Sequence, residues 1–354
     1  MLTMTDSYVA LRRSAGYYVR DMQIAAVRGP ARLKLVKWLL AKSIEFAEPG
    51  RVVESLLIDD QAVVRGTAIA VIDEDELLLL TEADEDLLAT LTASAANLAL
   101  SASDVEVSPV RDLVTLQVEG PLAWRAVEDA LKGEHISSLL LNECRRYPSG
   151  GDLSRLIRIG TTAEFGYLVL VPVATRPRIE AEWEARLAEL GGGMIDPGCL
   201  DRVRAEVNHP VLPDQACGLS AFEAGIAWLV SLEREDPYRG AAALTLEEST
   251  RRVVAAFSSG ANFPAVGTEV VDGAVHVGVV QVSAPRCGRD DGFGLLLLDK
   301  PFDCPGFDCS VESTDPLFAA SCQESEPPAV ASENWPPRLG CNSYVVCIRR
   351  RSCA

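Results

Sequence analysis

The sequence predicts an α+β protein with more than one domain and a β-rich C-terminal part. The chain has 354 residues, whereas a single domain usually has about 100 to 200. A unit of strand, Gly-Pro and helix occurs twice in the first 131 residues. From about residue 250, short apolar runs alternate with glycine turns, which is typical of a small β-barrel or sandwich. Hydrophobic residues make up 48% and charged residues 24%, as in ordinary globular proteins.

The repeated unit places a proline at the start of each helix, where its missing N–H costs nothing. The dipeptides are Gly29-Pro30 and Gly120-Pro121, about ninety residues apart. The flanking elements are predicted strands at 22–28 and 113–119 and predicted helices at 30–46 and 122–131. An internal structural repeat explains this pattern, although two short matches also arise by chance.

Other segments have clear periodicity up to residue 300. Residues 51–81 alternate apolar runs with turn residues and predict two or three paired strands. Residues 83–100 predict a helix with an acidic first turn, and residues 178–193 predict a helix closed by glycines. Residues 153–173 predict two strands joined by a polar turn. After Pro301 the chain is rich in Pro, Ser and Cys, and its pattern predicts no particular fold.

The charge and the N-terminus narrow the class of protein. A formal net charge of -18 argues against non-specific binding to nucleic acid, which needs clustered Lys and Arg. The N-terminus lacks the pattern of a secretory signal, and no run of about 18 apolar residues exists, so we expect a cytoplasmic protein without a membrane segment. Seven of the ten cysteines fall in the last quarter, and cytosolic reduction argues against a disulfide framework.

Four segments, in order, resemble the aminomethyltransferase (glycine-cleavage T-protein) family. Residues 113–131 resemble its strand, Gly-Pro and helix element, and residues 155–172 resemble its Arg-Thr-Gly-Tyr-Thr-Gly-Glu-x-Gly-Tyr-Glu turn and strand. Residues 200–208 are similar to its Arg-x-x-Leu-Arg-Leu-Glu-Ala-Gly segment. Residues 219–244 match best, with Glu223-Ala-Gly-Ile-Ala-Trp228 in place of Glu-Ala-Gly-Leu-Gly-Trp. Weaker matches at 20–57 and 250–298 extend the resemblance.

The resemblance implies a three-domain fold. Two related mixed α/β domains would surround a central channel that takes folate, followed by a small C-terminal β-barrel. The expected divisions are 1–50 with 150–248 for the folate-binding domain, 51–149 for the second α/β domain, 249–300 for the β domain and 301–354 for a tail. The implied cofactor is tetrahydrofolate, and the implied partner is a small amine, ether or thioether that donates a one-carbon unit. The sequence leaves the oligomeric state open.

Two acidic residues are the candidate catalytic groups that the resemblance implies. Residues 50–57 correspond to a family pattern with two adjacent acids, where Glu54 takes the first position and Ser55 replaces the second. If the first acid of the pattern is the catalytic one, Glu54 would stabilise positive charge that develops during transfer. If the second is the catalytic one, this chain has lost it. Asp59 is a candidate substitute for the missing acid, and a turn pair of Asp59 with Asp60 is the alternative.

Five residues are the candidate cofactor-binding groups: Glu206, Arg204, Tyr167, Arg239 and Trp228. Glu206 matches a family glutamate that grips the pterin, since a carboxylate accepts two parallel hydrogen bonds. Its alternative is a surface pair with a neighbouring arginine. Arg239 would hold the glutamate tail of folate, or would simply be exposed at a helix start. Trp228 would line the pterin wall or pack in the core.

The sequence departs from the family at two further points. Leu168 stands where the family has the Glu of Gly-Tyr-Glu, and Thr161 where it has a Tyr. These changes favour a specialised relative, such as a demethylase-like or tailoring enzyme, over the standard glycine-cleavage enzyme. A non-catalytic folate-binding protein and a protein-interaction module are the alternatives.

We predict no metal site, because a possible set of four cysteines has irregular spacing and no nearby histidine. That set is Cys304, Cys309, Cys341 and Cys347.

Overall fold

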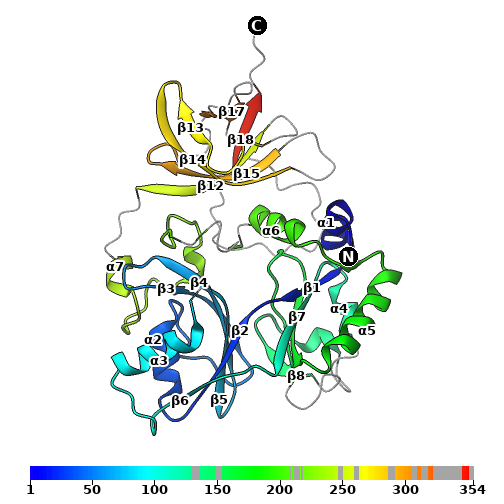
Figure 1. Ribbon diagram of the computed structural model, residues 1–354, viewed down its shortest axis with the longest axis vertical. Coiled ribbons are helices and arrows are strands. Elements are labelled where there is room, and N and C mark those ends of the chain that lie inside the picture. Colours follow the sequence, from blue (N-terminus) through cyan, green and yellow to red (C-terminus); the bar gives the residue numbers. More distant parts are fainter. Residues whose placement is uncertain are drawn as a thin grey trace. The chain divides into compact units, whose positions relative to one another are not determined.

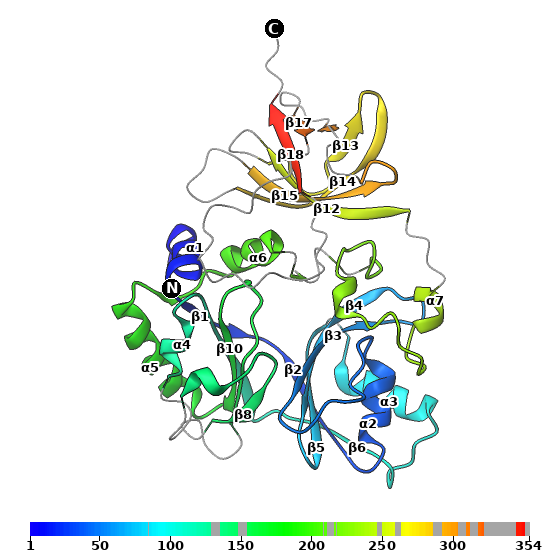
Figure 2. The ribbon, with the colours of Figure 1, turned by 180° about the vertical axis from the view of Figure 1, so that it is seen from behind.

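In a computed structural model of the protein, the described part of the chain forms two compact units (Figure 1; Figure 2). Unit 1 contains Met1–Val203 and Leu229–Leu246, and unit 2 contains Arg204–Trp228 and Glu247–Ala354. The described residues are 1–83, 85–128, 135–147, 154–207, 209–210, 216, 218–245, 250–258, 263–285, 292–303, 309–311, 318–321 and 345–350.

Unit 1 contains a six-stranded sheet in the order β11-β1-β7-β10-β9-β8. Its strands are β1 (Gly16–Arg20), β7 (Leu113–Glu119), β8 (Cys144–Arg146), β9 (Arg155–Ile157), β10 (Gly166–Pro172) and β11 (Gly193–Met194). Three helices lie near it, α1 (Met4–Arg13), α4 (Ala123–Ala126) and α5 (Arg176–Glu189), with a 3-10 turn at Ile136–Ser138. Trp183 of α5 packs edge-on against Tyr17 of β1, with ring centroids 6.2 Å apart, in a fully apolar core.

A second sheet of unit 1 has five strands in the order β3-β4-β5-β2-β6. They are β2 (Gln23–Arg28), β3 (Val52–Ile58), β4 (Val64–Ile72), β5 (Glu76–Ala83) and β6 (Glu106–Pro109). Helices α2 (Arg32–Leu39) and α3 (Leu87–Asn97) pack on one face of this sheet. Asp86 caps α3 through hydrogen bonds to the N–H groups of Leu88 and Ala89. The helix begins at Leu87, so its first turn holds no acidic residue and the predicted acidic first turn was wrong in this detail.

Both sheets contain the repeated unit, and its glycines are required by close backbone contacts. Gly29 has φ 98° and Gly120 has φ 132°, in the left-handed region that side chains disfavour. A Cβ on Gly29 would lie 2.6 Å from the carbonyl oxygen of Asp104, and one on Gly120 would lie 2.5 Å from that of Ser14. In both Gly-Pro turns, the glycine therefore has a left-handed backbone and a close backbone neighbour that leave no room for a side chain.

Helix α2 is shorter than the sequence predicts. The apolar spacing predicts a helix over 30–46, but α2 ends at Leu39. Leu40 forms a β-bridge with Leu57, and the guanidinium of Arg234 donates to the carbonyl oxygens of Lys37 and Leu40. These bonds satisfy carbonyls that the helix end leaves free. The prediction was wrong because the apolar residues after Leu39 fill the core from an irregular segment of bends and turns.

The faces of the two sheets that lack helices share one apolar layer (Figure 1). The layer contains Ile24, Ala26, Val52, Ile69, Val71, Leu78 and Leu80 from the second sheet, and Leu113, Cys144, Ile157, Leu168 and Leu170 from the first, with Ile159 just beyond β9. Unit 1 thus has four layers in the order helices, sheet, sheet and helices. Side chains that alternate with the buried layer along each strand face the helices instead.

Unit 2 is mainly a sheet in the order β12-β15-β14-β13-β16-β17-β18, in which β12 also pairs with β18 and closes the ring of strands. The strands are β12 (Arg251–Ser258), β13 (Glu269–Asp272), β14 (Val275–Pro285), β15 (Gly292–Asp299), β16 (Cys309–Val311), β17 (Phe318–Ser321) and β18 (Val345–Arg350). Glu223 contacts the first residues of β12. Its carboxylate accepts from Arg251 Nε at 2.7 Å, and its backbone carbonyl accepts from the N–H of Val253.

The remaining elements are α6 (Pro197–Glu206), a 3-10 turn at Ala227–Leu229 and α7 (Ala241–Thr245). The predicted mixture of helices and sheets is confirmed, whereas the three-domain division stays a prediction. Most of the tail after Pro301 lies outside the described residues. Within the described part of the chain, no helix has the length and apolar character needed to cross a membrane.

Candidate active site

The layer between the two sheets of unit 1 becomes polar at one end. Arg20 and Gln117 come from β1 and β7, and Glu54 and Glu82 come from β3 and β5. Strand registers place them on the faces that carry the apolar layer: Gln117 pairs with Leu168, and Glu54 pairs with Ile69. We call Arg20, Glu54, Glu82 and Gln117 the polar cluster.

Arg20 is the buried cation of the polar cluster, with 2% of its surface exposed. Its Nη2 donates to Glu82 Oε2 at 2.8 Å, and its Nη1 donates to Gln117 Oε1 at 3.4 Å. Among the described residues, its Nε has no acceptor. Burial opposes the positive charge, but the carboxylates of Glu82 and Glu54 outweigh that cost and raise the pKa of Arg20 above its ordinary value.

Glu54 is half-buried on β3, on the side of the strand that also carries Val52. The adjacent Ser55 points to the opposite, helix-covered side, where its Oγ accepts from the backbone N–H of Lys42 at 2.9 Å. The two positions of the expected acidic pair therefore face different layers. Only Glu54 belongs to the polar cluster.

Glu119 is a further buried carboxylate, with no exposed surface, at the end of β7. Five donors surround it: the hydroxyl of Tyr18 at 2.6 Å, and the backbone N–H and hydroxyl groups of Thr161 and Thr162 at 2.5 to 2.9 Å. A carboxylate with so many donors is stable without a cation. Glu119 therefore fixes the turn after β9 that resembles the family's Tyr-Thr-Gly turn.

Sequence reasoning missed Glu119, Arg20 and Glu82. Glu119 lies within the strand, Gly-Pro and helix segment, whose pattern predicts a fold element and not a functional carboxylate. Its polar character inside a β-run of apolar residues was the available signal. Arg20 and Glu82 are 62 residues apart in the chain, and only the packing of the two sheets brings them together.

Arg12 and Glu164 lie beside this turn. Arg12 Nη1 is 3.5 Å from Glu164 Oε1 and donates to the carbonyl oxygen of Thr162 at 2.9 Å. Burial raises the pKa of Glu164 above its ordinary value, the charge of Arg12 opposes the shift, and the charge of Glu119 adds to it. Two charged groups thus hold the turn: Glu119 accepts from its N–H groups, and Arg12 donates to the carbonyl oxygen of Thr162.

Asp59, the second candidate catalytic residue, forms the turn between β3 and β4. It accepts from the N–H groups of Gln61 at 2.9 Å and Val63 at 3.0 Å, and from Arg65 Nε at 2.8 Å and Nη2 at 2.5 Å. Burial alone would raise its pKa, but the bonds from Val63, Arg65 and Gln61 outweigh it and hold the pKa of Asp59 below its ordinary value. Both oxygens of its carboxylate thus accept hydrogen bonds from residues of the same turn and strand.

Tyr167 lies on the opposite side of β10 from the polar cluster. It is 3% exposed and packs in the helix-covered core that contains Tyr17 and Trp183. Burial raises its pKa above the ordinary value, with the charge of Arg158 opposing. Its neighbour Leu168 lies in the apolar layer between the sheets, where the family pattern has a glutamate.

Arg239 lines a hollow of about 300 Å³ on unit 1. Its backbone N–H donates to the carbonyl of Trp38 at 2.8 Å, and its guanidinium lies 3.8 Å from Asp60 and 3.6 Å from Glu85. The other lining residues include Thr90, Ser94 and Asn97 of α3. Two carboxylates therefore offset its charge in this structure.

Three predicted cofactor-binding residues belong to unit 2. Arg204 is 8% exposed and Glu206 is half-buried, both at the end of α6. The ring of Trp228 lies 6.1 Å from that of His209, whose backbone N–H donates to the carbonyl of Arg204 at 2.9 Å. The structure thus brings Arg204, Glu206 and Trp228 into one unit, while the other candidates belong to unit 1.

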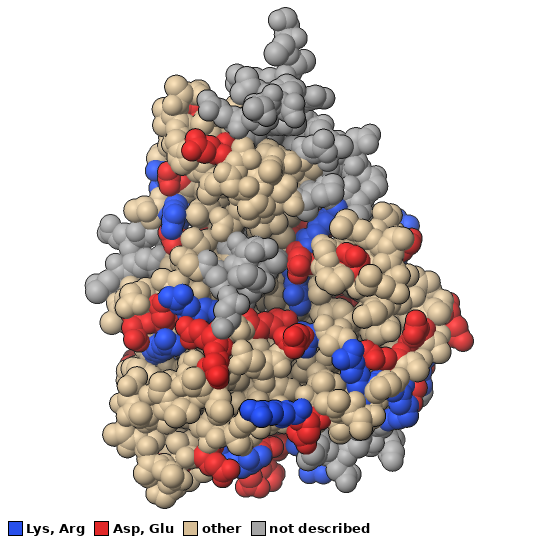
Figure 3. Space-filling model, in the orientation of Figure 1, with Lys and Arg blue, Asp and Glu red and all other residues tan. Residues whose placement is uncertain are grey.

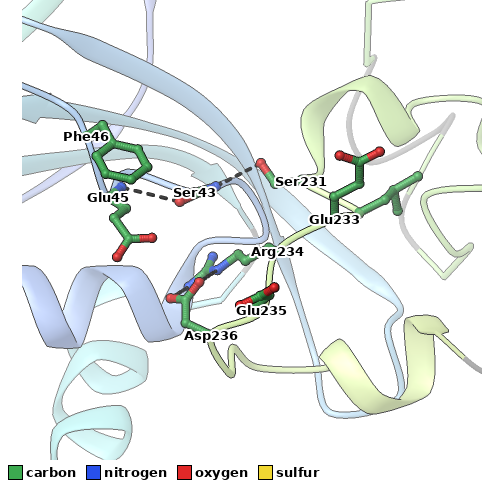
Figure 4. A pocket seen from close by; sticks show the side chains of 9 residues that line it. Ser43, Glu45, Phe46, Ser231, Glu233, Arg234, Glu235 and Asp236 are labelled. Atoms are coloured by element: carbon green, nitrogen blue, oxygen red, sulfur yellow. Dashed lines mark hydrogen bonds and ion pairs between the residues drawn. The ribbon is translucent and has the colours of Figure 1, made fainter.

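A larger hollow of about 830 Å³ lies on unit 1 where residues 43–46 meet residues 231–236 (Figure 4). Ser43 donates its backbone N–H to Ser231 Oγ at 3.1 Å, and Arg234 binds Asp236 through two bonds of 2.8 Å. Phe46, 93% exposed, stands at its edge. On the face shown in Figure 3, acidic and basic side chains lie interspersed.

The described cysteines Cys144, Cys199 and Cys309 are buried. Burial raises the pKa of the Cys144 thiol to about 12. No three His, Cys, Asp or Glu side chains form a metal-type group in the described ranges. Cys304 and Cys341 of the possible zinc set lie outside those ranges, as does the side chain of Cys347.

Comparisons with known proteins agree on one family. Residues 3–234 match the model of the GCVT N-terminal domain. An aminomethyltransferase of Thermotoga maritima is 22% identical over 82% of this chain and 80% of its own, and one of Streptomyces coelicolor is 25% identical over 85% and 82%. The crystal structure of glycine cleavage system aminomethyltransferase T from Bartonella henselae has a TM-score of 0.79, at 18% identity, over 92% of this chain and 89% of that one, so the folds are alike.

Proposed function

Since the chain belongs to the GCVT aminomethyltransferase family, we propose that it transfers a one-carbon unit from a small methylated donor to tetrahydrofolate. The family uses tetrahydrofolate as its cofactor. The observation that carries the proposal is the polar cluster, in which Glu54 and the Arg20–Glu82 pair interrupt an otherwise apolar layer. Buried charge of this kind is costly and is concentrated at functional sites.

The described residues fit tetrahydrofolate by the chemistry of their polar groups. Glu206 is a half-buried carboxylate and suits the paired N–H donors of a pterin edge. Arg204 and Trp228 of the same unit supply a cation and an aromatic face. Arg239 of unit 1 has the charge that an anionic tail requires, and Tyr167 is buried in the helix-covered core of unit 1. Bound tetrahydrofolate supplies the nitrogen that accepts the one-carbon unit.

Glu54 is the carboxylate that we propose to face the donor. It shares the layer between the sheets with the buried cation Arg20, and a carboxylate at this position would stabilise positive charge on a donor nitrogen. Asp59 keeps its carboxylate on Arg65 and two backbone N–H groups, so we assign it to holding β3 in place. Glu54 therefore acts without the acid that the family pattern has at the next position, where this chain has Ser55.

The departures from the family pattern favour a specialised, demethylase-like donor specificity. Leu168 fills the apolar layer where the family has a glutamate, and Ser55 faces the helices where the family has a second acid. The same two observations favour a second candidate function, a folate-binding protein without catalysis. Both candidates share the cofactor and differ only in turnover.

A turnover assay separates the two candidates. The full chain is incubated with tetrahydrofolate and a panel of methylated amines, ethers and thioethers, and methyl-tetrahydrofolate is measured by mass spectrometry. We expect one class of donor to be consumed, and Glu54→Gln to lower the rate by about 100-fold or more, as for other electrostatic catalytic groups. Glu106→Gln, an exposed position on β6, is the control. Full activity of Glu54→Gln would remove Glu54 from the mechanism, and no turnover with intact tetrahydrofolate binding would favour the second candidate.

A further inference from the structure

The hollow between residues 43–46 and 231–236 has a fixed floor built around Arg234 (Figure 4). The side chain of Arg234 is 1% exposed, and all three nitrogens of its guanidinium donate hydrogen bonds. The acceptors are Asp236, through two bonds of 2.8 Å, and the carbonyl oxygens of Lys37 and Leu40. The guanidinium also lies 4.6 Å from the centre of the Tyr238 ring. Arg234 therefore fixes the floor of the hollow, and Asp236 balances its charge.

The hollow carries more negative than positive charge. Lys37 Nζ lies 3.4 Å from Glu45 Oε1 and 3.5 Å from Asp236 Oδ2, so one ammonium group is shared by two carboxylates. Glu233 and Glu235 also line the hollow, and both are exposed. In the described part of the chain, neither of these two carboxylates has an ion pair or a hydrogen bond. Four carboxylates thus face two cations, which leaves two negative charges.

Two large apolar side chains lie exposed beside these carboxylates. Phe46 is 93% exposed and Leu232 is 57% exposed, and both line the hollow. In Figure 4, Phe46 and Glu233 lie on opposite sides of the hydrogen bond that joins Ser43 to Ser231. Phenylalanine is enriched in the buried centres of protein–protein interfaces, and an aromatic ring also attracts cations. The hollow therefore offers apolar and acidic contacts next to each other.

These contacts fit one kind of occupant better than the others. A small cation would neutralise Glu233 and Glu235 but would leave Phe46 and Leu232 in water. A segment of a protein that combines basic and apolar side chains satisfies both, because it buries the apolar surface and pairs the carboxylates. A second copy of this chain carries the same net charge of -18, which opposes its approach. Charge complementarity therefore favours a basic partner.

We propose that this hollow is a docking site for a basic segment of another protein. Lys or Arg side chains of the partner would contact Glu233 and Glu235, and an apolar side chain would pack against Phe46. The fixed floor provides a surface that needs no rearrangement before it binds, which lowers the cost of association. The claim goes beyond one-carbon transfer and does not depend on it, since these residues lie outside the polar cluster and the candidate cofactor-binding set.

Fluorescence anisotropy with a labelled peptide and the full chain tests the proposal. The probe is Gly-Leu-Lys-Arg-Leu-Lys-Gly with blocked ends, which combines basic and apolar side chains. We expect saturable binding with a Kd of about 100 μM or tighter in about 50 mM NaCl, and binding at least about fivefold weaker in about 300 mM NaCl. The double variant Glu233→Gln with Glu235→Gln should weaken binding at least about tenfold, since both charge-assisted contacts are lost.

The matched control is Glu74→Gln with Asp75→Asn, which removes two exposed carboxylates between β4 and β5 and changes the net charge equally. It should change the Kd by less than about twofold, because charges away from the contact are screened by salt. All four replaced carboxylates are exposed, so both double variants should keep their fold.

A third variant, Phe46→Ser, tests the apolar contact and should weaken the peptide at least about threefold. Spermine, a small polycation without an apolar side chain, is the competing probe. The absence of saturation up to about 1 mM peptide, or equal losses in the two double variants, would overturn the proposal. Spermine that binds as tightly as the peptide, together with an unchanged Kd for Phe46→Ser, would identify a site for small cations and would also overturn it.

Discussion

Arg20 of β1 and Glu82 of β5 form a 2.8 Å ion pair that joins the two sheets of unit 1. The pair lies at the polar end of a layer that is otherwise apolar. Its position adds one charged contact between the two sheets to the apolar contacts of the layer.

Removing Glu82 should destabilise the protein, because it leaves the guanidinium of Arg20 buried without its carboxylate. We expect Glu82→Ala to lower the free energy of unfolding by about 2 to 3 kcal/mol, less than for a fully buried pair because Glu82 is 24% exposed. Glu76→Ala is a matched control on the same strand: Glu76 is also 24% exposed, but its partner Arg28 is 46% exposed. It should cost at most about 1 kcal/mol. Equal losses in urea denaturation would contradict a special role for the buried pair.

Replacing Glu119 by glutamine should loosen the turn that carries Thr161 and Thr162. The amide group of glutamine presents N–H to donors that now meet oxygen, so at least one buried donor loses its acceptor. We expect a loss of about 1 to 3 kcal/mol in the free energy of unfolding. Hydrogen exchange of the Thr161 and Thr162 amides should accelerate as well. Unchanged exchange would show that other contacts hold the turn.

The contribution of Asp59 to stability should depend on pH. Its folded pKa is depressed, so its stabilisation is fully present above the ordinary carboxylate pKa and is lost as the pH falls through the folded value. Asp59→Asn should therefore unfold more easily than the wild type at pH 7, by about 1 to 3 kcal/mol. The difference between the two proteins should shrink as the pH falls toward the acidic range. A difference that stays constant with pH would rule out the charge of Asp59 as its origin.

The thiol of Cys144 should be unreactive in the folded protein. Burial raises its pKa to about 12, so almost no thiolate exists at pH 8. Iodoacetamide labelling followed by peptide mass spectrometry should show slow modification of Cys144 in buffer and fast modification in guanidinium. Rapid labelling in buffer would indicate that the layer between the sheets opens.

The sequence predicted the elements better than it predicted the site. Strands 22–28 and 113–119 and the glycine-closed helix at 178–193 correspond to β2, β7 and α5, because their periodicity reflects burial directly. Helix α2 was predicted too long, since apolar residues after Leu39 fill the core from an irregular segment.

Charged residues were harder to interpret because their partners are distant in sequence. The carboxylate of Asp59 is bound by Arg65 and its own turn, and Arg20 finds Glu82 only when two sheets pack together. Glu54 was identified from the family pattern, and the strand register alone shows that it and Ser55 face different layers. Spacing along the chain could not reveal these relationships.

Calorimetric titration of the full chain with tetrahydrofolate decides whether the protein is a folate-dependent member of its family. We expect saturable binding at tens of micromolar, and we expect Glu206→Ala to weaken it by about 1 to 3 kcal/mol through the lost bidentate contact. An absence of saturable heat in that range would contradict the folate-dependent function, and unchanged affinity of Glu206→Ala would contradict the assigned cofactor site.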